Sequence, residues 1–520
     1  MTSAEGGFPA SERSSASVHG SADFTLADFP EKAARWWGDR VAFAGSGTET
    51  TYRAFHSRVR RLAGVLSEAG VKEGTRVGLL SANDRAYFDL FFACAVLGAV
   101  VVPFNVRLSP REIAHQRENA DVDYAVVGPA LSDLAERAGL TAVTHWWLGG
   151  TYDAAIADAS PYPRRTVFPP DTPVSQMYTS GTTGFPKGCV HSQGGWRASA
   201  LNLALGMRLD RRAVALVQAP LFHAWGFGFI LSHLYMGASV VFPPGNGEDD
   251  YWEAIDRYQV TSASLPRSAP ANGLPRDQVT VAFGLAGSLR SSWKRLIDSF
   301  FPNAECYGVY GMTELTNIAI VSRSWEEAEN PGSMGEPLAG VQVEVHDEGG
   351  KPVGPGQVGE LVIRGPQLCL GYYKEPEATA ELFRDGWLRT GDLVLADDRG
   401  AIHFEDRAKD MIKTGGENVY SAEVERVLVE HPAVADAAVF GVPDKRWGEA
   451  VKAVVAPVPG ADIDLAELDS YCIENIAAYK RPRWYEVIAE IPRNPTGKVP
   501  KAELRRKHDP ATSIRLEERS

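Results

Sequence analysis

The sequence predicts an α/β protein built on parallel sheets, followed by a smaller mixed unit. Residues 24–170 alternate between apolar strand-like runs and helical segments, and strand-like runs return after residue 170. Because strand–helix–strand alternation places helices on both faces of a parallel sheet, this larger part is predicted to be α/β. Residues 332–408 instead alternate apolar and polar side chains between turns, which is typical of antiparallel strands. Beyond about residue 409 a further short unit of helices and strands follows.

The length and composition are those of an ordinary globular protein with several domains. The chain has 520 residues, so a prior of roughly 150 residues per domain suggests about three structural units. Apolar residues make up 44% and charged residues 23%, which excludes a mostly disordered chain. The formal net charge of −13 argues against nonspecific nucleic-acid binding, because tracking phosphates requires a large positive surface.

Neither the cysteines nor the first residues indicate export from the cell. Residues 1–22 are polar and rich in Ser, Gly and Ala, so we expect a loose tail without a signal or transit peptide. Five cysteines lie far apart and form no metal-binding or disulfide pattern: Cys94, Cys189, Cys306, Cys369 and Cys472. We therefore expect buried thiols and a cytoplasmic location. The most apolar stretch, Leu90–Pro103, is too short to span a bilayer.

The first segments follow helix and strand periods. Thr51–Gly70 has apolar residues at spacings of three and four and ends on glycine, which predicts a helix. The run RVGLLSAN that follows predicts a strand, because it is rich in Val and Leu and ends in turn formers. Leu90–Pro103, interrupted by Gly98, is predicted to be a buried helix that runs into a buried strand.

After residue 170, short strands are separated by turns rich in Gly, Pro and Ser. The runs QMYTS, ALVQAP, ASVVFPP and VTVAFGLAG each predict such a strand. In the C-terminal part, SAEVERVLVEHP and LAELDSYCIENI predict helices, whereas VADAAVFGVP and EAVKAVVAPV predict strands. The last twenty residues are strongly charged, and we expect them to close the domain as a helix.

A run of glycine and hydroxyl residues, YTSGTTGFPKG at 178–188, is the first candidate for chemistry. Its glycines allow backbone N–H groups to close around an oxyanion such as a phosphate, and Lys187 adds a positive charge. The run is not a Walker A loop, because Gly188 follows Lys187 where that motif requires Ser or Thr. On this fragment alone, a plain surface turn explains the sequence equally well.

Two further fragments offer carboxylates to a nucleotide. VYGMTE places Glu314, a hard oxygen ligand suited to Mg²⁺, after a strand-like run, and Tyr310 offers a ring for stacking on a base. WLRTGDL places Asp392 after a glycine turn, where a carboxylate can accept both hydroxyls of a ribose. A solvated glutamate and an Asx-turn are the plain alternatives for these two carboxylates.

The last two fragments lie in the C-terminal part. DRAKDMIKTGGENVYSAEVE contains Arg407, Lys409 and the pair Gly415 and Gly416. RNPTGK places Lys498 on a turn, where a lysine is usually only a surface charge. Each of these fragments is a modest signal by itself.

Taken together and in this order, the five fragments closely resemble the adenylate-forming superfamily of acyl-CoA synthetases, peptide-synthetase adenylation domains and beetle luciferases. The resemblance covers about residues 24–505. It implies a large N-terminal α/β domain with a β-barrel-like portion, joined by a short hinge to a small, mobile α+β C-terminal domain. We therefore predict a tail at 1–22, an AMP-binding domain at 23–408 and a mobile domain at 409–520, with the hinge at Lys409.

The resemblance implies a ligase reaction in two halves. A carboxylate attacks the α-phosphate of MgATP to give an acyl-adenylate and pyrophosphate, and a second nucleophile, most often the thiol of coenzyme A, displaces AMP. Because two anions react, catalysis must rest on positioning and charge stabilisation. The expected cofactors are ATP, Mg²⁺ and coenzyme A, the expected partner is a small carboxylic acid, and a homodimer is considered as the oligomeric state.

The resemblance assigns residues to the nucleotide site by position. Those expected to hold the β- and γ-phosphates are Thr179, Ser180, Gly181, Thr182, Thr183 and Lys187. Thr313 would contact the α-phosphate, and Glu314 would ligate Mg²⁺ together with Thr179. The residues expected at adenine and ribose are Ala286, Gly287, Ser288, Tyr310, Asp392 and Arg407. Lys498 would bridge the attacking carboxylate and the α-phosphate, so its charge counts most in the transition state.

A second set of residues serves the thiol and the acyl group. The C-terminal domain would rotate to withdraw Lys498 and open a thiol tunnel lined by Gly415 and Gly416. Free coenzyme A is favoured over a carrier protein by four further matches, which are Trp447, Tyr479, Arg481 and Arg483. A core aromatic and a solvated basic turn are the alternatives for these four. His223, in PLFHAWGFG, matches a histidine that gates or lines the acyl pocket, although such a residue is more often a core histidine.

The sequence departs from the family pattern at a few positions. Leu265-Pro266-Arg267 replaces a usual Val-Pro-Thr, and we hypothesise that Arg267 pairs with a polar or anionic group of the acid. A solvated arginine, the more common case, is the alternative at this position. Asp406 replaces a glycine before the hinge, and Ser421 replaces a common proline. Two other functions stay open: transfer to a carrier-protein thiol, an amine or nitrite, and, more remotely, a phosphotransferase or nucleotide-sensing module.

Overall fold

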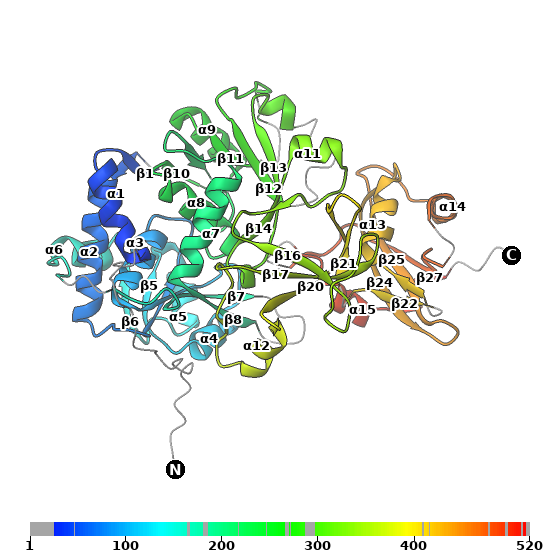
Figure 1. Cartoon of the computed structure of the whole chain (residues 1–520), viewed down its shortest axis with the longest axis horizontal. Coiled ribbons are helices and arrows are strands. Elements are labelled where there is room, and N and C mark those ends of the chain that lie inside the picture. The colour runs from blue at the N-terminus through cyan, green and yellow to red at the C-terminus, as the bar shows by residue number, and fades with distance from the viewer. Residues whose placement is uncertain are drawn as a thin grey trace, which may run out of the picture. The chain divides into compact units, whose positions relative to one another are not determined.

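The computed structural model describes residues 25–45, 47–163, 167–179, 186–216, 218–245, 247–265, 270, 272–285, 297–407, 410–414, 417–476, 479–494, 498–510 and 513–515. The chain divides into two compact units, of which the first comprises Met1–Gln342 with Arg364–Leu388 and the second Val343–Ile363 with Arg389–Ser520. Both units mix helices and strands (Figure 1), which confirms the predicted fold class. None of the helices formed by these residues is long and apolar enough to cross a membrane.

The first unit contains a nine-stranded sheet with a parallel centre. Its strand order is β15-β14-β13-β12-β11-β9-β10-β1-β2. The pairs from β13 to β1 are parallel, and β2, β14 and β15 add antiparallel edges. The strands are β1 Val41–Gly45, β2 Thr48–Thr51, β9 Val214–Leu216, β10 Ser239–Phe242, β11 Ser262–Ser264, β12 Val281–Leu285, β13 Glu305–Gly311, β14 Ile318–Arg323 and β15 Glu336–Pro337.

A second, seven-stranded sheet of this unit has the order β18-β8-β7-β4-β3-β5-β6. The pairs from β7 to β6 are parallel, whereas β8 runs antiparallel to β7 and β18. Its strands are β3 Arg76–Leu80, β4 Val100–Pro103, β5 Val122–Val127, β6 Thr144–Trp147, β7 Pro173–Thr179, β8 Lys187–Ser192 and β18 Gly371–Tyr372. The strands that the apolar runs predict in the first 290 residues are therefore present.

The helices of the first unit begin and end where local sequence signals place them. Thr51 caps the helix that follows it, because its hydroxyl accepts the N–H of Ala54 at 3.2 Å. The buried helix predicted from residue 90 ends at Gly98, whose φ of +68° lets the chain turn at once into β4. The helices are η1 Leu26–Asp28, α1 Phe29–Trp37, α2 Tyr52–Glu68, α3 Ala86–Leu97, α4 Pro110–Asn119, η2 Pro129–Leu131, α5 Ser132–Arg137, α6 Thr151–Asp158, α7 Gln193–Gly206, α8 Ala224–Tyr235, α9 Glu248–Tyr258, η3 Thr313–Leu315, α11 Ser324–Glu329 and α12 Pro376–Leu382.

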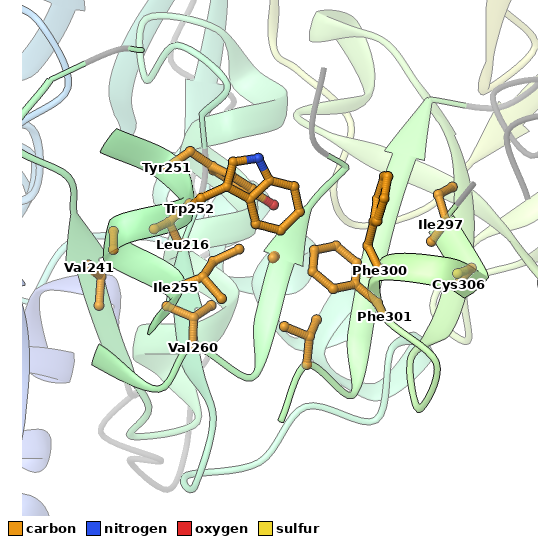
Figure 2. Packing of buried hydrophobic residues seen from close by; sticks show 14 residues of the cluster. Leu216, Val241, Tyr251, Trp252, Ile255, Val260, Ile297, Phe300, Phe301 and Cys306 are labelled. Atoms are coloured by element: carbon orange, nitrogen blue, oxygen red, sulfur yellow. The ribbon is translucent and has the colours of Figure 1, made fainter. Parts of the chain in front are cut away.

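Aromatic side chains fix these helices to one another and to the sheets. Figure 2 shows Trp252 of α9 beside Phe300 and Phe301. The ring centroid of Trp252 lies 5.8 Å from that of Phe300 and 5.7 Å from that of Phe301. Residues of β9, β10, β11 and β12 complete this buried cluster beside α9. The indole of Trp196 on α7 also contacts Phe227 of α8, at 4.9 Å between ring centroids. Helix α7 is therefore anchored by its largest buried side chain.

A five-stranded sheet occupies much of residues 342–407. Its strand order is β16-β17-β20-β19, and β21 pairs with β20. The pairs of β20 with β19 and β21 are antiparallel, as the alternating pattern predicts for this stretch. The strands are β16 Gln342–His346, β17 Val358–Arg364, β19 Phe383–Arg384, β20 Trp387–Ala396 and β21 Ile402–Arg407.

The C-terminal residues form a six-stranded sheet with order β23-β22-β25-β26-β27, in which β24 pairs with β25. Its elements are β22 Ile412–Thr414, β23 Glu417–Val419, α13 Ser421–Glu430, β24 Val434–Asp444, β25 Gly448–Pro457, α14 Leu465–Asn475, β26 Trp484–Val487, α15 Lys501–Arg506 and β27 Ile514–Arg515. The helix expected over the last twenty residues is present at Lys501–Arg506, but the described residues 507–510 and 513–515 are not helical, so the prediction is wrong there. Ile514 instead pairs with Tyr485, because backbone groups at the edge of β26 need partners that a longer helix would not supply.

Two predictions about the whole chain have different outcomes. All five cysteines are buried and free of disulfides, as their spacing predicts. The boundary predicted at residue 408 stays a prediction, because Lys409 and the tail at 1–22 lie outside the described residues. By contacts, residues 343–363 and 389–407 group with the C-terminal residues.

Candidate active site

The described ends of the predicted phosphate loop form a strand pair. Thr179 ends β7 and Lys187 begins β8, and their Cα atoms are partners in the antiparallel ladder. The preceding Tyr178 holds this end of β7, because its hydroxyl donates to Asn119 Oδ1 at 2.7 Å. The predicted loop residues Ser180, Gly181, Thr182 and Thr183 lie outside the described residues.

One tyrosine joins the loop lysine to the predicted magnesium ligand. The ammonium of Lys187 lies 5.2 Å from the ring centroid of Tyr372, on β18. The hydroxyl of Tyr372 donates to Glu314 Oε1 at 2.7 Å, and Glu314 is only 6% exposed. Burial and the neighbouring Glu314 carboxylate raise the pKa of Tyr372 far above its usual value, so the phenol keeps its proton and remains a donor. Lys187 and Glu314, 127 positions apart in the numbering, thus flank one side chain.

The turn that carries Thr313 and Glu314 is held through its backbone carbonyl groups. We call residues 313–317, between β13 and β14, the 313–317 turn. Donors from outside it reach the carbonyl oxygens of the turn and of the next strand: His191 Nε2 to Thr313 at 2.8 Å, Cys369 N to Glu314 at 2.9 Å, and Gln367 Nε2 to Leu315 at 3.1 Å and to Ile318 at 2.7 Å. These bonds fix the direction in which the Thr313 and Glu314 side chains point.

The same turn contains a strained residue. Thr316 has φ +64°, a left-handed conformation that β-branched residues rarely adopt, and it is fully buried. Such a backbone conformation costs about 1–3 kcal/mol and persists only where the surroundings impose it. The two bonds from the Gln367 amide lie on either side of Thr316 and supply that restraint.

Of the residues predicted to flank the adenine, the structure describes Tyr310 in the nine-stranded sheet. Tyr310 is half-buried near the end of β13 and pairs with Ile320 of β14. Ala286, Gly287 and Ser288 lie outside the described residues. These three residues directly follow Leu285, the last residue of β12. Leu285 is the Cα partner of Val309, which precedes Tyr310 on β13.

The two residues predicted to bind the ribose lie opposite each other on neighbouring strands of the second unit. Asp392 on β20 and Arg407 on β21 are direct Cα partners in the antiparallel ladder. Asp392 is only 1% exposed, and its N–H donates to Thr390 Oγ1 at 3.1 Å. The backbone of Arg407 is described but its side chain is not, so the ladder alone places it beside Asp392.

His223 lies at the start of α8 in aromatic surroundings. It is half-buried, and its carbonyl accepts the N–H of Phe227 at 3.1 Å in the first turn of the helix. Its ring is 4.6 Å from that of Phe222, and the ring of Trp225 lies 5.6 Å from that of Phe283. Arg267, which is hypothesised to pair with a group of the acid, lies outside the described residues.

The predicted catalytic lysine is exposed on a loop that Asn494 closes. Asn494 Oδ1 accepts the N–H of Lys498 at 2.9 Å, and the N–H of Asn494 donates to the Lys498 carbonyl at 2.8 Å. The backbone at Lys498 is thereby fixed while its side chain stays accessible. Gly415 and Gly416, the predicted tunnel residues, lie outside the described residues between β22 and β23.

Only part of the predicted coenzyme A set comes together. Trp447 lies between β24 and β25, and the guanidinium carbons of Arg446 and Arg483 lie 4.5 and 5.2 Å from its ring centroid. Arg481 points into the unit instead, because it is 7% exposed and its Nε lies 3.3 Å from Asp469. Tyr479 is 40% exposed.

Asp406 and Ser421, the two departures from the family pattern near the predicted hinge, contact each other. The backbone N–H of Ser421 donates to the buried carboxylate of Asp406, and the Ser421 hydroxyl donates to Asp406 Oδ1 at 3.1 Å. Lys501 Nζ donates to the same hydroxyl at 2.6 Å. A proline at 421 would lack this N–H, so serine suits an aspartate at 406.

Comparison with known proteins identifies the family of this chain. Residues 29–373 match the family of AMP-binding enzymes, and residues 423–498 match the AMP-binding enzyme C-terminal domain. The chain belongs to the AMP-binding enzyme family. It is 35% identical to a feruloyl-CoA synthase of an Amycolatopsis species over 515 residues, covering 93% of this chain and 99% of that protein. The predicted family is therefore confirmed.

Two further similarities bear on chemistry. A fatty acid–[acyl-carrier-protein] ligase of Streptomyces coeruleorubidus is 34% identical over 480 residues, 88% of this chain and 92% of that protein. The o-succinylbenzoate CoA synthetase of Bacillus subtilis, solved with its acyl-adenylate intermediate, superposes with a TM-score of 0.80 at 27% identity, over 92% of this chain and 97% of that one. These findings confirm the predicted class of enzyme, an AMP-forming acid–thiol ligase.

Three site residues were missed by the motifs. His191, Gln367 and Tyr372 hold the 313–317 turn, yet none lies within the fragment that contains it. The sequence signal that could have identified them is a polar residue within an apolar run, such as His191 in GCVHS or Gln367 in GPQLCLGYY. Such a residue, once buried, must find a hydrogen-bond partner.

Replacing Tyr372 tests the link between this tyrosine and Glu314. Tyr372→Phe leaves the buried Glu314 carboxylate without the phenolic donor, so metal-dependent activity should fall about 10- to 100-fold, as for other residues that orient metal ligands. The loss should shrink as Mg²⁺ is raised in an ATP–pyrophosphate exchange assay. Tyr373→Phe is the matched control, because the adjacent hydroxyl donates to Asp121. Equal losses in the two variants would contradict the assignment.

Proposed function

We propose that this enzyme joins a carboxylic acid to coenzyme A through an acyl-adenylate, releasing pyrophosphate and then AMP. The observation that supports this most is the pairing of a cation and a hard carboxylate around one tyrosine. Lys187 lies over the ring of Tyr372, and the carboxylate of Glu314 accepts a hydrogen bond from the hydroxyl of Tyr372. This is the set of charges that the phosphates of MgATP require.

The described residues around Glu314 fit a magnesium ion that is bound largely through phosphates. Mg²⁺ usually takes one or two protein carboxylates and completes its shell with phosphate oxygens and water. Among the described residues no cluster of three or more metal-binding side chains occurs, which agrees with such a shared site. Glu314, oriented by Tyr372, would hold the ion with Thr179, and bound Mg²⁺ would neutralise phosphate charge.

For the first half reaction, we assign binding and charge stabilisation to separate groups. Lys187 would bind the leaving pyrophosphate, Thr313 the α-phosphate, and Asp392 with Arg407 the ribose. Lys498 would meet the attacking carboxylate and the α-phosphate, where its ammonium offsets the repulsion of two anions. His223 would lie beside the acyl group. None of these groups needs to transfer a proton, because the attacking carboxylate is already ionised.

For the second half reaction, the cluster of Trp447, Arg446 and Arg483 favours coenzyme A over a carrier protein. An indole flanked by two guanidinium groups offers a surface for stacking on an adenine and positive charge for its phosphates. A phosphopantetheine arm on a carrier protein has no adenine to recognise. The resemblance to an acyl-carrier-protein ligase keeps that acceptor as the alternative. A cytoplasmic location and a homodimer stay predictions.

We infer that the acid is aromatic. The half-buried Trp225 lies in the first turn of α8, two positions after the N-cap residue His223, and its ring contacts Phe283. The ring of Phe283 also stacks on Phe229, at 3.6 Å between centroids. Aromatic side chains favour an aryl ligand through offset and edge contacts. The similarity to feruloyl-CoA synthase agrees with this inference.

The central test separates the two half reactions at Lys498. Lys498→Ala should lower adenylate formation about 100- to 1,000-fold, because a positioned charge at the reacting phosphorus is lost. Transfer to coenzyme A from a supplied acyl-adenylate should stay near the wild-type rate. Lys507→Ala, at an exposed lysine of the same unit, is the control. Similar losses in both half reactions would refute the proposed role.

A second test addresses the acceptor. Trp447→Ala and Arg483→Ala should each raise the KM for coenzyme A about 10-fold, the size expected for one charge-assisted or stacking contact, and leave ATP–pyrophosphate exchange unchanged. Arg506→Ala, at an exposed arginine of α15, controls for loss of charge.

Mass spectrometry of the products distinguishes an acyl-CoA from an acyl carrier protein, an amide or a nitrite product, and ADP in place of AMP would indicate a phosphotransferase.

A panel of acids tests the aromatic substrate. The kcat/KM for cinnamate- and benzoate-type acids should exceed that for short-chain and fatty acids by at least about 10-fold, the discrimination that an apolar pocket can supply. Trp225→Leu should reduce this preference, whereas Trp325→Leu on α11, an exposed tryptophan, should leave it unchanged. A wild-type preference for fatty acids would overturn the inference.

A further inference from the structure

A chain of buried side chains leads from α7 to the 313–317 turn. Trp196 Nε1 donates to Ser175 Oγ at 2.7 Å, and Ser175 Oγ lies 3.1 Å from His191 Nδ1. On the other side of the ring, His191 Nε2 lies 2.8 Å from the carbonyl oxygen of Thr313. Trp196, Ser175 and His191 are each fully buried.

With the imidazole of His191 neutral, the donors and acceptors of this chain can be arranged in only one way. The Thr313 carbonyl can only accept, so His191 Nε2 carries the proton and Nδ1 is the acceptor. Ser175 must therefore donate to Nδ1, and its oxygen is free to accept from the indole of Trp196. Burial lowers the pKa of His191 to about 4, so a neutral imidazole is expected near pH 7.

His191 also lies on the strand that begins with the loop lysine. Side chains two residues apart on a strand point to the same face, so Lys187, Cys189 and His191 share one face of β8. Lys187 lies over Tyr372, which binds Glu314, and His191 binds the Thr313 carbonyl. Strand β8 belongs to the seven-stranded sheet, whereas the 313–317 turn follows β13 of the nine-stranded sheet. The His191 bond therefore ties the two sheets together where the phosphates would be bound.

We propose that His191 is a positioning residue for adenylate formation, which sets the placement of the 313–317 turn relative to Lys187. This inference rests on the proposed function. MgATP would have to contact Lys187 and Thr313 at the same time, so a shift between β8 and the turn would misplace the α-phosphate. A misplacement of about 1 Å can cost about 100-fold in rate.

The test compares two buried histidines of the same unit. His191→Leu removes the donor to Thr313. His233→Leu is the matched control, because His233 is equally buried and bonds Ser262 Oγ at 3.0 Å and the Phe229 carbonyl at 2.9 Å. His191→Gln keeps a side-chain N–H near the position of Nε2 and should restore most of the activity. Ser175→Ala removes the donor to Nδ1 and should give an intermediate loss.

The expected result is a loss confined to one kinetic constant. Per folded enzyme, His191→Leu should lower kcat for adenylate formation by up to about 100-fold, with the KM for the acid and transfer from supplied acyl-adenylate unchanged. His233→Leu should lower the melting temperature to a similar extent without this kinetic loss. Equal kinetic losses in the two leucine variants, or no recovery in His191→Gln, would overturn the proposal.

A spectroscopic measurement tests the chain without nucleotide. The two-bond ¹H–¹⁵N spectrum of the wild-type imidazoles should show His191, identified by its absence from His191→Gln, as the neutral Nε2–H tautomer. A Nδ1–H tautomer would overturn the proposed chain. If the wild-type enzyme shows no pyrophosphate exchange with any acid, the proposed function fails, whereas this spectrum still tests the hydrogen bonds.

Discussion

The backbone of the 313–317 turn depends on donors that other segments supply. A strained, buried turn keeps its shape only if its carbonyl groups are paired, because an unpaired buried acceptor costs about 1–3 kcal/mol. Here the donors are the side chain of His191 on β8 and, in the segment before β18, the side chain of Gln367 and the backbone N–H of Cys369. The placement of the predicted metal ligand therefore follows from how the two sheets of the first unit meet, and not from the turn sequence alone.

Much of the fold could be predicted from the sequence, because its periodic segments are strong and local. The helix after Thr51 and the buried helix ending at Gly98 occur where their spacing and end signals place them. The C-terminal end could not be predicted in the same way, because β27 is two residues long and exists only through its pairing with β26. A pairing between distant segments leaves no period in the sequence.

In the candidate site too, residues in local motifs could be predicted, whereas those that act through distant contacts could not. Motifs identified Lys187 and Glu314, which lie within short characteristic runs, and in the structure both contact Tyr372. The side chains that orient them come from other parts of the chain and could not be found by spacing. Family correspondence also does not decide whether a side chain points inward: Arg483 lies at Trp447, but Arg481, two residues earlier, pairs with Asp469 inside the unit. Burial and pairing decide this.

The burial of all five thiols has a practical consequence for testing the predicted mobility of the C-terminal domain. Buried thiols react slowly with maleimide dyes as long as the protein is folded, because the reagent needs access to a thiolate. A pair of cysteines introduced at exposed positions, one in each unit, would therefore be labelled with little background. Energy transfer between two fluorophores could then test in single molecules whether the distance between the units changes, without first removing any native cysteine.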